Sequence, residues 1–365
     1  MATLKEVARL AGVSASTVSR IINGKGEKCA GAAVQKRVWD AVRATGYVPN
    51  QEAKRLKEGG GAPKEAITVS CLFARAEDYK EDSFFNALAA CVEEEVLRQG
   101  CRLGLRYSHK DALRLCREEA FAPGRTEGLV VLGKSGPDCE GLIGRFKKRV
   151  VHITLNQMEI RRDHIVCDGW HAAEMALQYL YEAGHRVIGY VGETEKEIRY
   201  RGYRAFMLDV GLTPGPIFPA AMNPAGGHRA VERILAAKTR PTALFCANDA
   251  TAQGVLRGLA EAGVAVPAQM SVISIDNIPE AEQTKPLLTT VKVPFRDLGS
   301  FAVKTLLDRI DHGHTVPLNI FMPCELVVRQ SVAAPRSDAN MGGYVISPRS
   351  ALTPQPGGLF PPGDG

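Results

Sequence analysis

The stretch GLVVLGKS, from Gly128 to Ser135, has the spacing of a phosphate-binding loop: a glycine, four variable residues, a glycine, a lysine and a serine. In such a loop the variable residues bend around the phosphates, and the lysine and serine begin a helix. Here the four variable residues are Leu-Val-Val-Leu, which predict a buried strand, and Gly136-Pro137 is expected to prevent a helix from starting there. Nucleotide hydrolysis is therefore disfavoured. Lys134 is expected at the end of a strand, either touching a ligand or simply solvated.

The other reactive residue types form no catalytic or metal-binding set. His312 and His314 lie two residues apart in a predicted loop that lacks an acid and cysteine partner set. The nine cysteines are scattered without a C-x-x-C pair, which indicates reduced, mostly buried thiols rather than disulfides or a zinc site. We therefore predict no enzymatic activity, no metal and no cofactor.

Positive charge is concentrated at the start of the chain. Residues 1–60 contain eleven Lys and Arg against five Asp and Glu, whereas the remainder is balanced. A basic segment on a neutral body is typical of a module that binds polyanions, although a merely solvated charged surface has the same composition. The opening MATLKEVARL lacks the apolar run of a secretory signal, and no segment is apolar for long enough to span a bilayer. A cytoplasmic protein is expected.

The basic segment has the pattern of short helices. Thr3 and Glu6 have the spacing of a capping box, and Gly12 is expected to make a turn before Ser14 caps a second helix. Two helices joined by such a turn form a helix-turn-helix. Apolar residues recur at helical spacing in three segments, with Tyr47 closing the core: Leu4, Val7, Ala8 and Ala11, then Val18, Ile21 and Ile22, then Val34, Val38, Ala41 and Val42.

The body of the chain, from Ala66 to about Val332, alternates strand-like runs with segments long enough for a crossover helix. The strand-like runs are ITVSCLF, CRLGLRY, GLVVL, VVHIT, VIGYVG, TALFCA and SVISID. This alternation predicts parallel sheets covered by helices on both faces. In sheets of this kind, ligands bind beyond the carboxyl ends of the strands.

These segments resemble the lactose/galactose repressor (LacI/GalR) family over most of the chain. The similarity lies in TLKEVARLAGVSASTVSRIING and GYVPNQEAKRL near the start, and in EAGHRVIGYVG, PTALFCAND and ELVVRQS further on. The resemblance implies an all-α helix-turn-helix head and an α/β body similar to periplasmic sugar-binding proteins, with two parallel-sheet subdomains around a ligand cleft. VVLGK and ISIDNIPEAEQTKPLLTTVKVP lean toward the evolved β-galactosidase repressor branch.

The expected domain map follows from this resemblance. Residues 1–48 form the DNA-binding head, 49–63 a hinge helix and glycine-rich linker, and 64–333 the ligand-binding and dimerisation domain. Its first subdomain comprises about 64–157 plus 290–320, and its second about 158–289 plus 321–333. Residues 334–365 are rich in Pro and Gly without periodicity, which predicts a disordered tail.

For the head, the resemblance implies that the second helix lies in the major groove and that the hinge helix forms only on operator DNA. Ala15 and Ser16 are small enough for close approach to bases, and Arg20 is expected to reach a guanine, with a phosphate contact as the alternative. Leu56 is expected to insert into the minor groove, with a core position as the alternative. The predicted DNA-binding residues are Thr3, Ser14, Ala15, Ser16, Thr17, Ser19, Arg20, Asn23, Tyr47, Asn50, Lys54, Arg55 and Leu56.

For the body, the resemblance places a small effector among residues at strand ends. Polar side chains would bind hydroxyl pairs and aromatic rings would cover an apolar ring face. The aromatic residues have plain core positions as their alternative, and Asp276 has a turn cap as its alternative. Asn156 stands where the family often has a carboxylate. The predicted effector-binding residues are Phe84, Phe85, Lys134, Asn156, Arg199, Asn248, Asp276 and Phe295.

The sequence thus predicts a homodimeric, sequence-specific repressor of palindromic operator DNA, controlled by a small galactoside-like sugar, with no membrane partner. A solute-binding protein of sugar transport and an enzyme on an α/β scaffold are the alternatives from other classes. The residues leave open whether the effector induces or co-represses, and whether a phosphorylated carrier protein acts as co-repressor.

Overall fold

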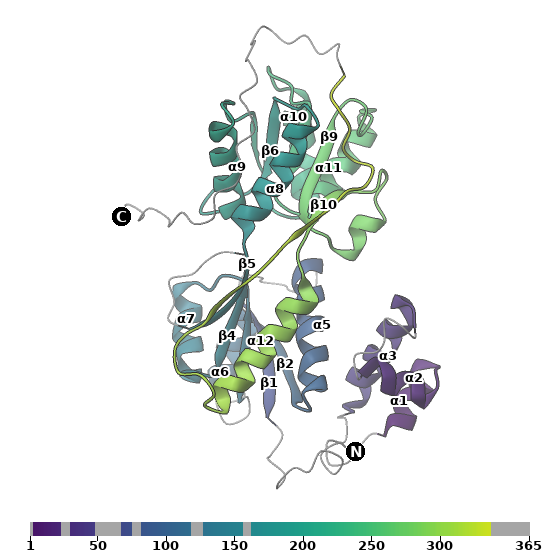
Figure 1. The fold of residues 1–365 in the computed structure, drawn as a ribbon, viewed down its shortest axis with the longest axis vertical. Helices are drawn as coiled ribbons and strands as arrows, with labels where there is room; N and C mark the ends of the chain where they lie inside the picture. The colour runs from purple at the N-terminus through teal and green to yellow at the C-terminus, as the bar shows by residue number, and fades with distance from the viewer. Residues whose placement is uncertain are drawn as a thin grey trace. The chain divides into compact units, whose positions relative to one another are not determined.

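The computed structural model describes residues 3–22, 30–47, 67–74, 82–117, 127–155 and 162–336 (Figure 1). Several predicted features lie outside these ranges. They are the hinge and linker at 49–63, the tail from residue 337, and the predicted site residues Asn23, Asn50, Lys54, Arg55, Leu56 and Asn156. In the part of the chain that is described, no helix combines the length and apolar character needed to cross a membrane.

The head contains the helices α1 Leu4–Ala11, α2 Ala15–Arg20 and α3 Ala32–Thr45. The capping box is present, because Thr3 accepts a hydrogen bond from the backbone N–H of Glu6 while the Glu6 carboxylate accepts one from the backbone N–H of Thr3. Gly12 makes the turn with a φ of 65°, a left-handed conformation that glycine adopts without strain. Ser14 caps α2 by accepting from the backbone N–H of Thr17 at 3.1 Å. The helix-turn-helix is confirmed.

The apolar faces of these helices form one small core. Val7, Val18, Ile21, Val38 and Val42 are each almost completely buried, as the helical spacing predicted. Tyr47 packs against this core and is half-buried. A side chain that pattern analysis did not single out, Trp39, is also buried there. The core therefore fixes the angle between α1 and α2, and so determines which face of α2 remains exposed.

The first subdomain contains a parallel sheet in the order β11-β5-β4-β3-β1-β2. Its strands are β1 Thr68–Phe73, β2 Arg102–Ser108, β3 Gly128–Leu132, β4 Val150–Thr154, β5 Asp163–Cys167 and β11 Asn319–Met322. Helices α5 Ser83–Arg98 and α12 Phe295–Ile310 lie side by side on one face (Figure 1). The other elements of this subdomain are α6 His109–Arg117, α7 Pro137–Ile143 and a short 3₁₀ turn at Gly144–Phe146.

Alternation along β3 shows how this sheet is covered on both faces. Val130 and Leu132 belong to the core that contains Leu88 of α5 and Leu298 of α12. Leu129 and Val131 point to the opposite face, in the cluster that α7 completes. Every residue of β3 is buried, which is the pattern of a strand between two helical layers.

The second subdomain contains a sheet in the order β12-β10-β9-β8-β6-β7, parallel except for the antiparallel pair β10–β12. Its strands are β6 Ile188–Gly192, β7 Ile217–Pro219, β8 Ala243–Cys246, β9 Ser271–Asp276, β10 Thr289–Lys292 and β12 Glu325–Val327. Its helices are α8 Gly169–Glu182, α9 Ile198–Asp209, α10 Pro224–Leu235, α11 Asp249–Glu261 and a 3₁₀ turn at Pro279–Glu282. Helices α8 and α9 pack on one face of the sheet, and α10 and α11 on the other.

The chain crosses between the subdomains after β5, after β10 and after β11. These crossings come later than the expected boundaries at residues 157, 290 and 320, since β5 extends the first sheet to Cys167 and β10 keeps Lys292 in the second. The strand β5 was missed because DHIVC begins with two polar residues, which hide its pairing from a search for apolar runs.

The segment after GLVVLGKS corrects one expectation and confirms another. Leu129 to Leu132 form β3, so the four variable residues are a strand as predicted, and no phosphate loop is made. Gly136-Pro137 does not block a helix, however, because α7 begins at Pro137 with Gly136 as its N-cap. Proline is favourable at the first helical position, where its missing N–H has no intrahelical partner to lose.

A second correction concerns His314, which does have acidic partners. Its ring nitrogens hydrogen-bond with Asp163 at 3.1 Å and with Asp308 at 2.5 Å. Asp163 is also held by Arg309, whose Nε donates to it at 2.8 Å, and by the backbone N–H of Leu318 at 2.8 Å. Although burial opposes ionisation, these hydrogen bonds lower the pKa of Asp163 below its ordinary value. The cluster joins β5, the end of α12 and the segment that leads into β11.

Replacing Arg309 by methionine should lower the free energy of unfolding by about 3–5 kcal/mol, because Asp163 would keep a buried charge without its bidentate partner. Urea denaturation of the full chain measures the change. Arg257→Met is the matched control, since Arg257 is exposed and its pair with Glu261 at 3.8 Å should contribute less than about 1 kcal/mol. Equal losses in the two variants would contradict a special role for the buried pair.

Candidate nucleic-acid interface and ligand site

The exposed face of α2 is the part of the head that can approach another molecule closely. Ser16 and Arg20 are exposed and stand one helical turn apart, whereas Val18 between them is completely buried. Ala15, Thr17 and Ser19 are half-buried on the flanks. Around this face the head carries an excess of Lys and Arg. A small side chain and a guanidinium on one exposed ridge suit the width and the acceptor pattern of a DNA major groove.

The cap of α2 organises the start of this ridge. The Ser14 hydroxyl hydrogen-bonds with the hydroxyls of Ser16 and Thr17, at 2.8 Å in each case, in addition to capping the helix. Thr3 is exposed at the start of α1, where its N-cap role already uses its side chain. The predicted DNA-binding residues of the described head therefore divide into three places: α2 with its cap, the start of α1, and Tyr47 after α3.

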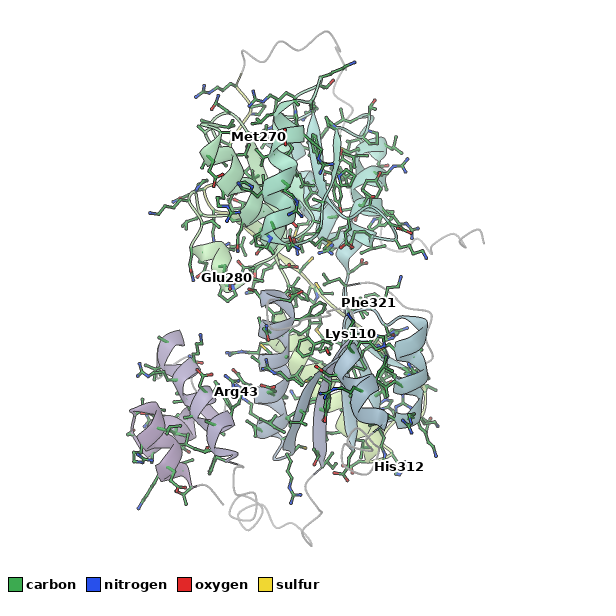
Figure 2. All side chains as sticks on the ribbon, turned by 180° about the vertical axis from the view of Figure 1, so that it is seen from behind. Arg43, Lys110, Met270, Glu280, His312 and Phe321 are labelled. Carbon is green, nitrogen blue, oxygen red and sulfur yellow. The ribbon has the colours of Figure 1, made fainter. Side chains whose placement is uncertain are left out.

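In the body, the strands define which end of each subdomain can hold a ligand. Met270 precedes β9 and Glu280 follows it, and the two lie at opposite ends of the second subdomain (Figure 2). Lys110 follows β2 and His312 precedes β11, and these mark the two ends of the first subdomain in the same way (Figure 2). The carboxyl ends of the strands thus lie at the Glu280 end of the second subdomain and at the Lys110 end of the first. Ligands of parallel α/β sheets bind at such ends.

Asp276 is the last residue of β9 and the most unusual side chain at this edge. It is 2% exposed, and its Oδ1 has no hydrogen-bond partner within the described residues. Its φ of 130° lies in a region that residues other than glycine rarely occupy. Burial, followed by the neighbouring Asp249, raises the pKa of Asp276 well above its ordinary value, while Arg199 acts in the opposite direction. A buried, unpaired carboxyl held in a strained backbone is typical of a ligand site.

Arg199 lies in the first turn of α9, and its guanidinium is bound by a carboxylate that sequence reasoning missed. Its Nε donates to Glu197 Oε1 at 2.7 Å, and its Nη2 donates to Glu197 Oε2 at 3.1 Å. Nη1 donates to the carbonyl oxygen of Ala247 at 2.9 Å. Both charged residues are buried, with 4% of Arg199 and 3% of Glu197 exposed. Glu197 and Asp276 raise the pKa of Arg199 despite its burial, so it remains a cation.

Asn248 is the N-cap of α11 and has a structural role at the predicted position. Its Oδ1 accepts from the backbone N–H of Thr251 at 2.9 Å, and its Nδ2 donates to the carbonyl oxygen of Met222 at 3.2 Å. An amide nitrogen carries two N–H groups, so one donor remains for a ligand. The structure therefore places Asn248, Arg199 and Asp276 at the carboxyl ends of β8, β6 and β9, which are neighbouring strands.

The three predicted phenylalanines gather in the first subdomain. The ring centroids of Phe84 and Phe85 are 5.2 Å apart, those of Phe84 and Phe295 are 5.1 Å apart, and both pairs meet edge to face. All three side chains are half-buried and pack against the main core. They form an apolar surface at the start of α5 and of α12. Lys134 is exposed two residues after the end of β3.

Two acidic residues at this edge escaped pattern analysis. Glu197 could have been found from its position, because it precedes Arg199 by two residues at the start of a predicted helix. Asp249 follows Asn248 directly but is completely buried, and its partners Ser274 and Thr290 are far away in sequence. No local signal in the sequence predicts that arrangement.

Comparisons with known proteins agree with this description. Residues 3–50 match the family described as bacterial regulatory proteins, lacI family, and residues 177–332 match the periplasmic binding protein-like domain. The HTH-type transcriptional repressor PurR of Mannheimia succiniciproducens is 30% identical over 341 residues, covering 91% of this chain and 99% of that protein.

Solved structures give the same result for the whole architecture. The complex of the transcriptional regulator CelR with cellobiose has a TM-score of 0.66 and 25% sequence identity, covering 91% of this chain and 100% of that one. The lac repressor dimer bound to operator and the anti-inducer ONPF has a TM-score of 0.64 over 91% of this chain and 99% of that one. At 21% identity the latter similarity shows a shared fold.

The buried carboxyl of Asp276 gives a stability prediction with a defined pH dependence. The pKa is above the ordinary 3.8, so the folded state holds this proton to a higher pH than the unfolded state, and ionisation at rising pH destabilises the fold. Asp276→Asn keeps the shape, tolerates a positive φ and cannot ionise. It should raise the free energy of unfolding by about 1–3 kcal/mol, more at pH 8 than at pH 5.

Thermal denaturation of wild type and variant across this pH range measures the effect. Asp209→Asn is the control, because Asp209 is exposed at the end of α9 and should change little. If the increase in stability of Asp276→Asn does not grow with pH, ionisation of the Asp276 carboxyl does not destabilise the folded state.

Proposed function

Because the chain belongs to the LacI family of bacterial regulatory proteins and is a DNA-binding transcriptional repressor, we propose that a homodimer binds a palindromic operator in the cytoplasm under the control of a small galactoside-like sugar. The head reads the operator through α2. The sugar binds at the carboxyl ends of the strands of the body and changes operator affinity. Relatives of this chain are transcriptional regulators, and the protein is not an enzyme.

The exposed ridge of Ser16 and Arg20 carries the proposal for DNA. The helix that bears it is capped by Ser14, is fixed by a buried core, and stands in the most basic part of the chain. An arginine at such a position can donate two hydrogen bonds to O6 and N7 of a guanine, while the surrounding Lys and Arg neutralise phosphates. The two-fold symmetry of a dimer would place two such helices in successive major grooves.

The proposal for the effector rests on Arg199, Asn248 and Asp276 at neighbouring strand ends of the second subdomain. A sugar offers hydroxyl groups that donate to the unpaired oxygen of Asp276 and accept from the remaining N–H of Asn248. The phenylalanines of the first subdomain offer an apolar surface for the face of a pyranose ring. Lys134 and Asn156 are the further candidates for polar contacts.

Coupling between the two parts would pass through the hinge. We assign Lys54, Arg55 and Leu56 to DNA contacts there, with Leu56 inserted into the minor groove between base steps. The segment PNQEAKRLKEGGG is too short and too charged to be a stable helix alone, so operator binding would fold it. An effector that changes the relation between the two subdomains would shift this folding equilibrium.

A solute-binding protein of sugar transport is the second candidate, since the body alone matches the periplasmic binding protein-like domain over residues 177–332. That role gives no function to the helix-turn-helix or to the excess of Lys and Arg in the first sixty residues. A DNA-binding assay discriminates between the two, because only the repressor binds an operator tightly and specifically.

Arg20→Ala tests the proposed reading of DNA. The variant should lose about 1–3 kcal/mol of binding free energy at one base-pair position and accept other bases there. Selection of binding sites from a random library by wild type and variant measures this change. Lys5→Ala removes one positive charge from an exposed position of α1, and it serves as the control for a general effect of charge. If Arg20→Ala weakens all sequences alike, Arg20 contacts a phosphate and the assignment to a base is wrong.

Asp276→Asn tests the proposed effector site with the variant already introduced for stability. It should leave operator affinity without sugar unchanged. The sugar concentration needed for half of the response should rise by at least about tenfold, because an amide N–H group replaces one of the two carboxyl oxygens available to the ligand. Operator binding titrated with sugar by fluorescence anisotropy gives both values. Asp209→Asn should respond as wild type does. A normal response from Asp276→Asn would place the effector elsewhere.

A further inference from the structure

The ion pair between Glu197 and Arg199 changes what the effector site can accept. A guanidinium recognises a phosphate or carboxylate by presenting two parallel N–H groups to two oxygens. In this protein Glu197 already occupies that fork, with its two oxygens at 2.7 Å from Nε and 3.1 Å from Nη2. Glu197 Oε1 also accepts from the backbone N–H of Arg199 at 3.1 Å, so the carboxylate is held by the helix itself.

The charged groups that act on Asp276 are one cation, Arg199, and the acids Asp249, Asp82 and Glu197. Arg329 lies close by, and its guanidinium is hydrogen-bonded to Asn277 and Glu282. Glu197 cancels Arg199, which leaves Asp276 as a buried carboxyl with an unpartnered oxygen, and Asp82 of the first subdomain adds to the forces that oppose its ionisation. Lys134 is exposed, so water screens its charge. Whether Asp276 is ionised or protonated, an anionic ligand finds no compensating positive charge among these residues. Like charges brought together at a desolvated site weaken binding strongly.

Helix N-termini are the other common anion-binding groups, and three of them in the body are occupied by internal acids. By contrast, α11 is capped by the uncharged Asn248, and no described side chain caps α7 or α12. Asp82 accepts from the backbone N–H of Phe85 at 3.0 Å in α5, and Asp168 accepts from that of Trp170 at 2.9 Å in α8. Glu197 does the same in α9. Three helix ends that could attract a phosphate are therefore already paired with a carboxylate.

On the premise that the proposed effector function is correct, we propose that Glu197 sets the charge class of the effector. The ligand carries no phosphate or carboxylate, is uncharged or cationic, and donates a hydrogen bond to Asp276. Glu197 thus orients Arg199 and occupies the two N–H groups that would otherwise bind an anion. Phosphorylated and acidic sugars are excluded as a result. Neutral sugars and amino sugars remain as ligands.

A matched set of sugars tests this inference on the full chain. Isothermal titration calorimetry compares galactose, galactosamine, galactose 6-phosphate and galacturonate, with cellobiose, ribose and the flat bases adenine and guanine extending the uncharged probes. We expect wild type to bind at least one uncharged sugar, with galactosamine at least as tight as galactose. The phosphate and the uronate should bind at least about 100-fold more weakly than the best uncharged probe. This comparison requires no variant.

The variant Glu197→Gln keeps the size of the side chain and frees the guanidinium fork. The ratio of the affinity for uncharged sugars to the affinity for anionic sugars should fall by at least about tenfold. Glu195→Gln is the matched control. Glu195 is exposed two residues earlier, so this substitution should leave the affinity ratio unchanged. Melting temperature confirms that both variants are folded, and if Glu197→Gln is not, the comparison of ligand charges in wild type decides alone.

The outcomes separate this inference from the function on which it rests. Tight binding of galactose 6-phosphate or galacturonate by wild type, with a change in operator affinity, would overturn the inference and leave the effector-controlled repressor intact. If the affinity ratio is unchanged in a folded Glu197→Gln protein, the role assigned to Glu197 is likewise wrong. If no probe of any charge binds wild type or alters operator affinity, the proposed sugar effector is wrong, and the inference fails with it.

Discussion

The carboxylate of Asp249 is the interaction on which the ligand edge of the second subdomain depends. One oxygen accepts hydrogen bonds from Ser274 at 2.5 Å and from Thr290 at 2.6 Å, and the other accepts from the backbone N–H of Ile278 at 2.9 Å. A single side chain at the start of α11 thereby binds β9, β10 and the turn that follows Asp276. Burial raises the pKa of Asp249 to about 6, although these three hydrogen bonds favour the charged form and act in the opposite direction. Asp276, whose Oδ1 has no hydrogen-bond partner within the described residues, stands directly before this turn.

Pattern and periodicity predicted the elements that have strong local signals. The strands TVSCLF, GLVVL and SVISID are nearly continuous apolar runs, since both of their faces are covered by helices. Helices α1 and α2 were predicted from their caps and apolar stripes. The strands β5 and β10 were missed because they contain polar residues whose burial depends on neighbours from distant parts of the chain. The strands β7, β11 and β12 were also missed, since they are only three or four residues long and lie partly exposed. Gly136-Pro137 was misread because proline both ends helices and begins them.

The site was predictable only where a resemblance supplied the positions. Arg199, Asn248 and Asp276 were placed at strand ends by similarity, and the structure brings them to neighbouring strands. Their chemistry was not visible in the sequence. The contact of Arg199 with the carbonyl oxygen of Ala247 joins residues 48 apart in sequence. The unpartnered Oδ1 of Asp276 and its positive φ depend on the folded environment of the end of β9. The same limit applies to His314, whose acidic partners come from β5 and α12.

The strand order of the first sheet has a consequence for how the protein is made. Its edge strand β11 comes from residues 319–322, and the helix that covers β3, β4 and β5 is α12 at residues 295–310. Both are synthesised after almost all of the second subdomain. On the ribosome, the head can therefore fold early from residues 3–47. The first subdomain cannot complete its fold until nearly the whole chain has emerged, because one face of its sheet lacks α12. During that interval the second subdomain lacks only β12 and the segment up to Ala333, which hydrogen-bonds with β9. We therefore expect the part of the body encoded later to become compact first.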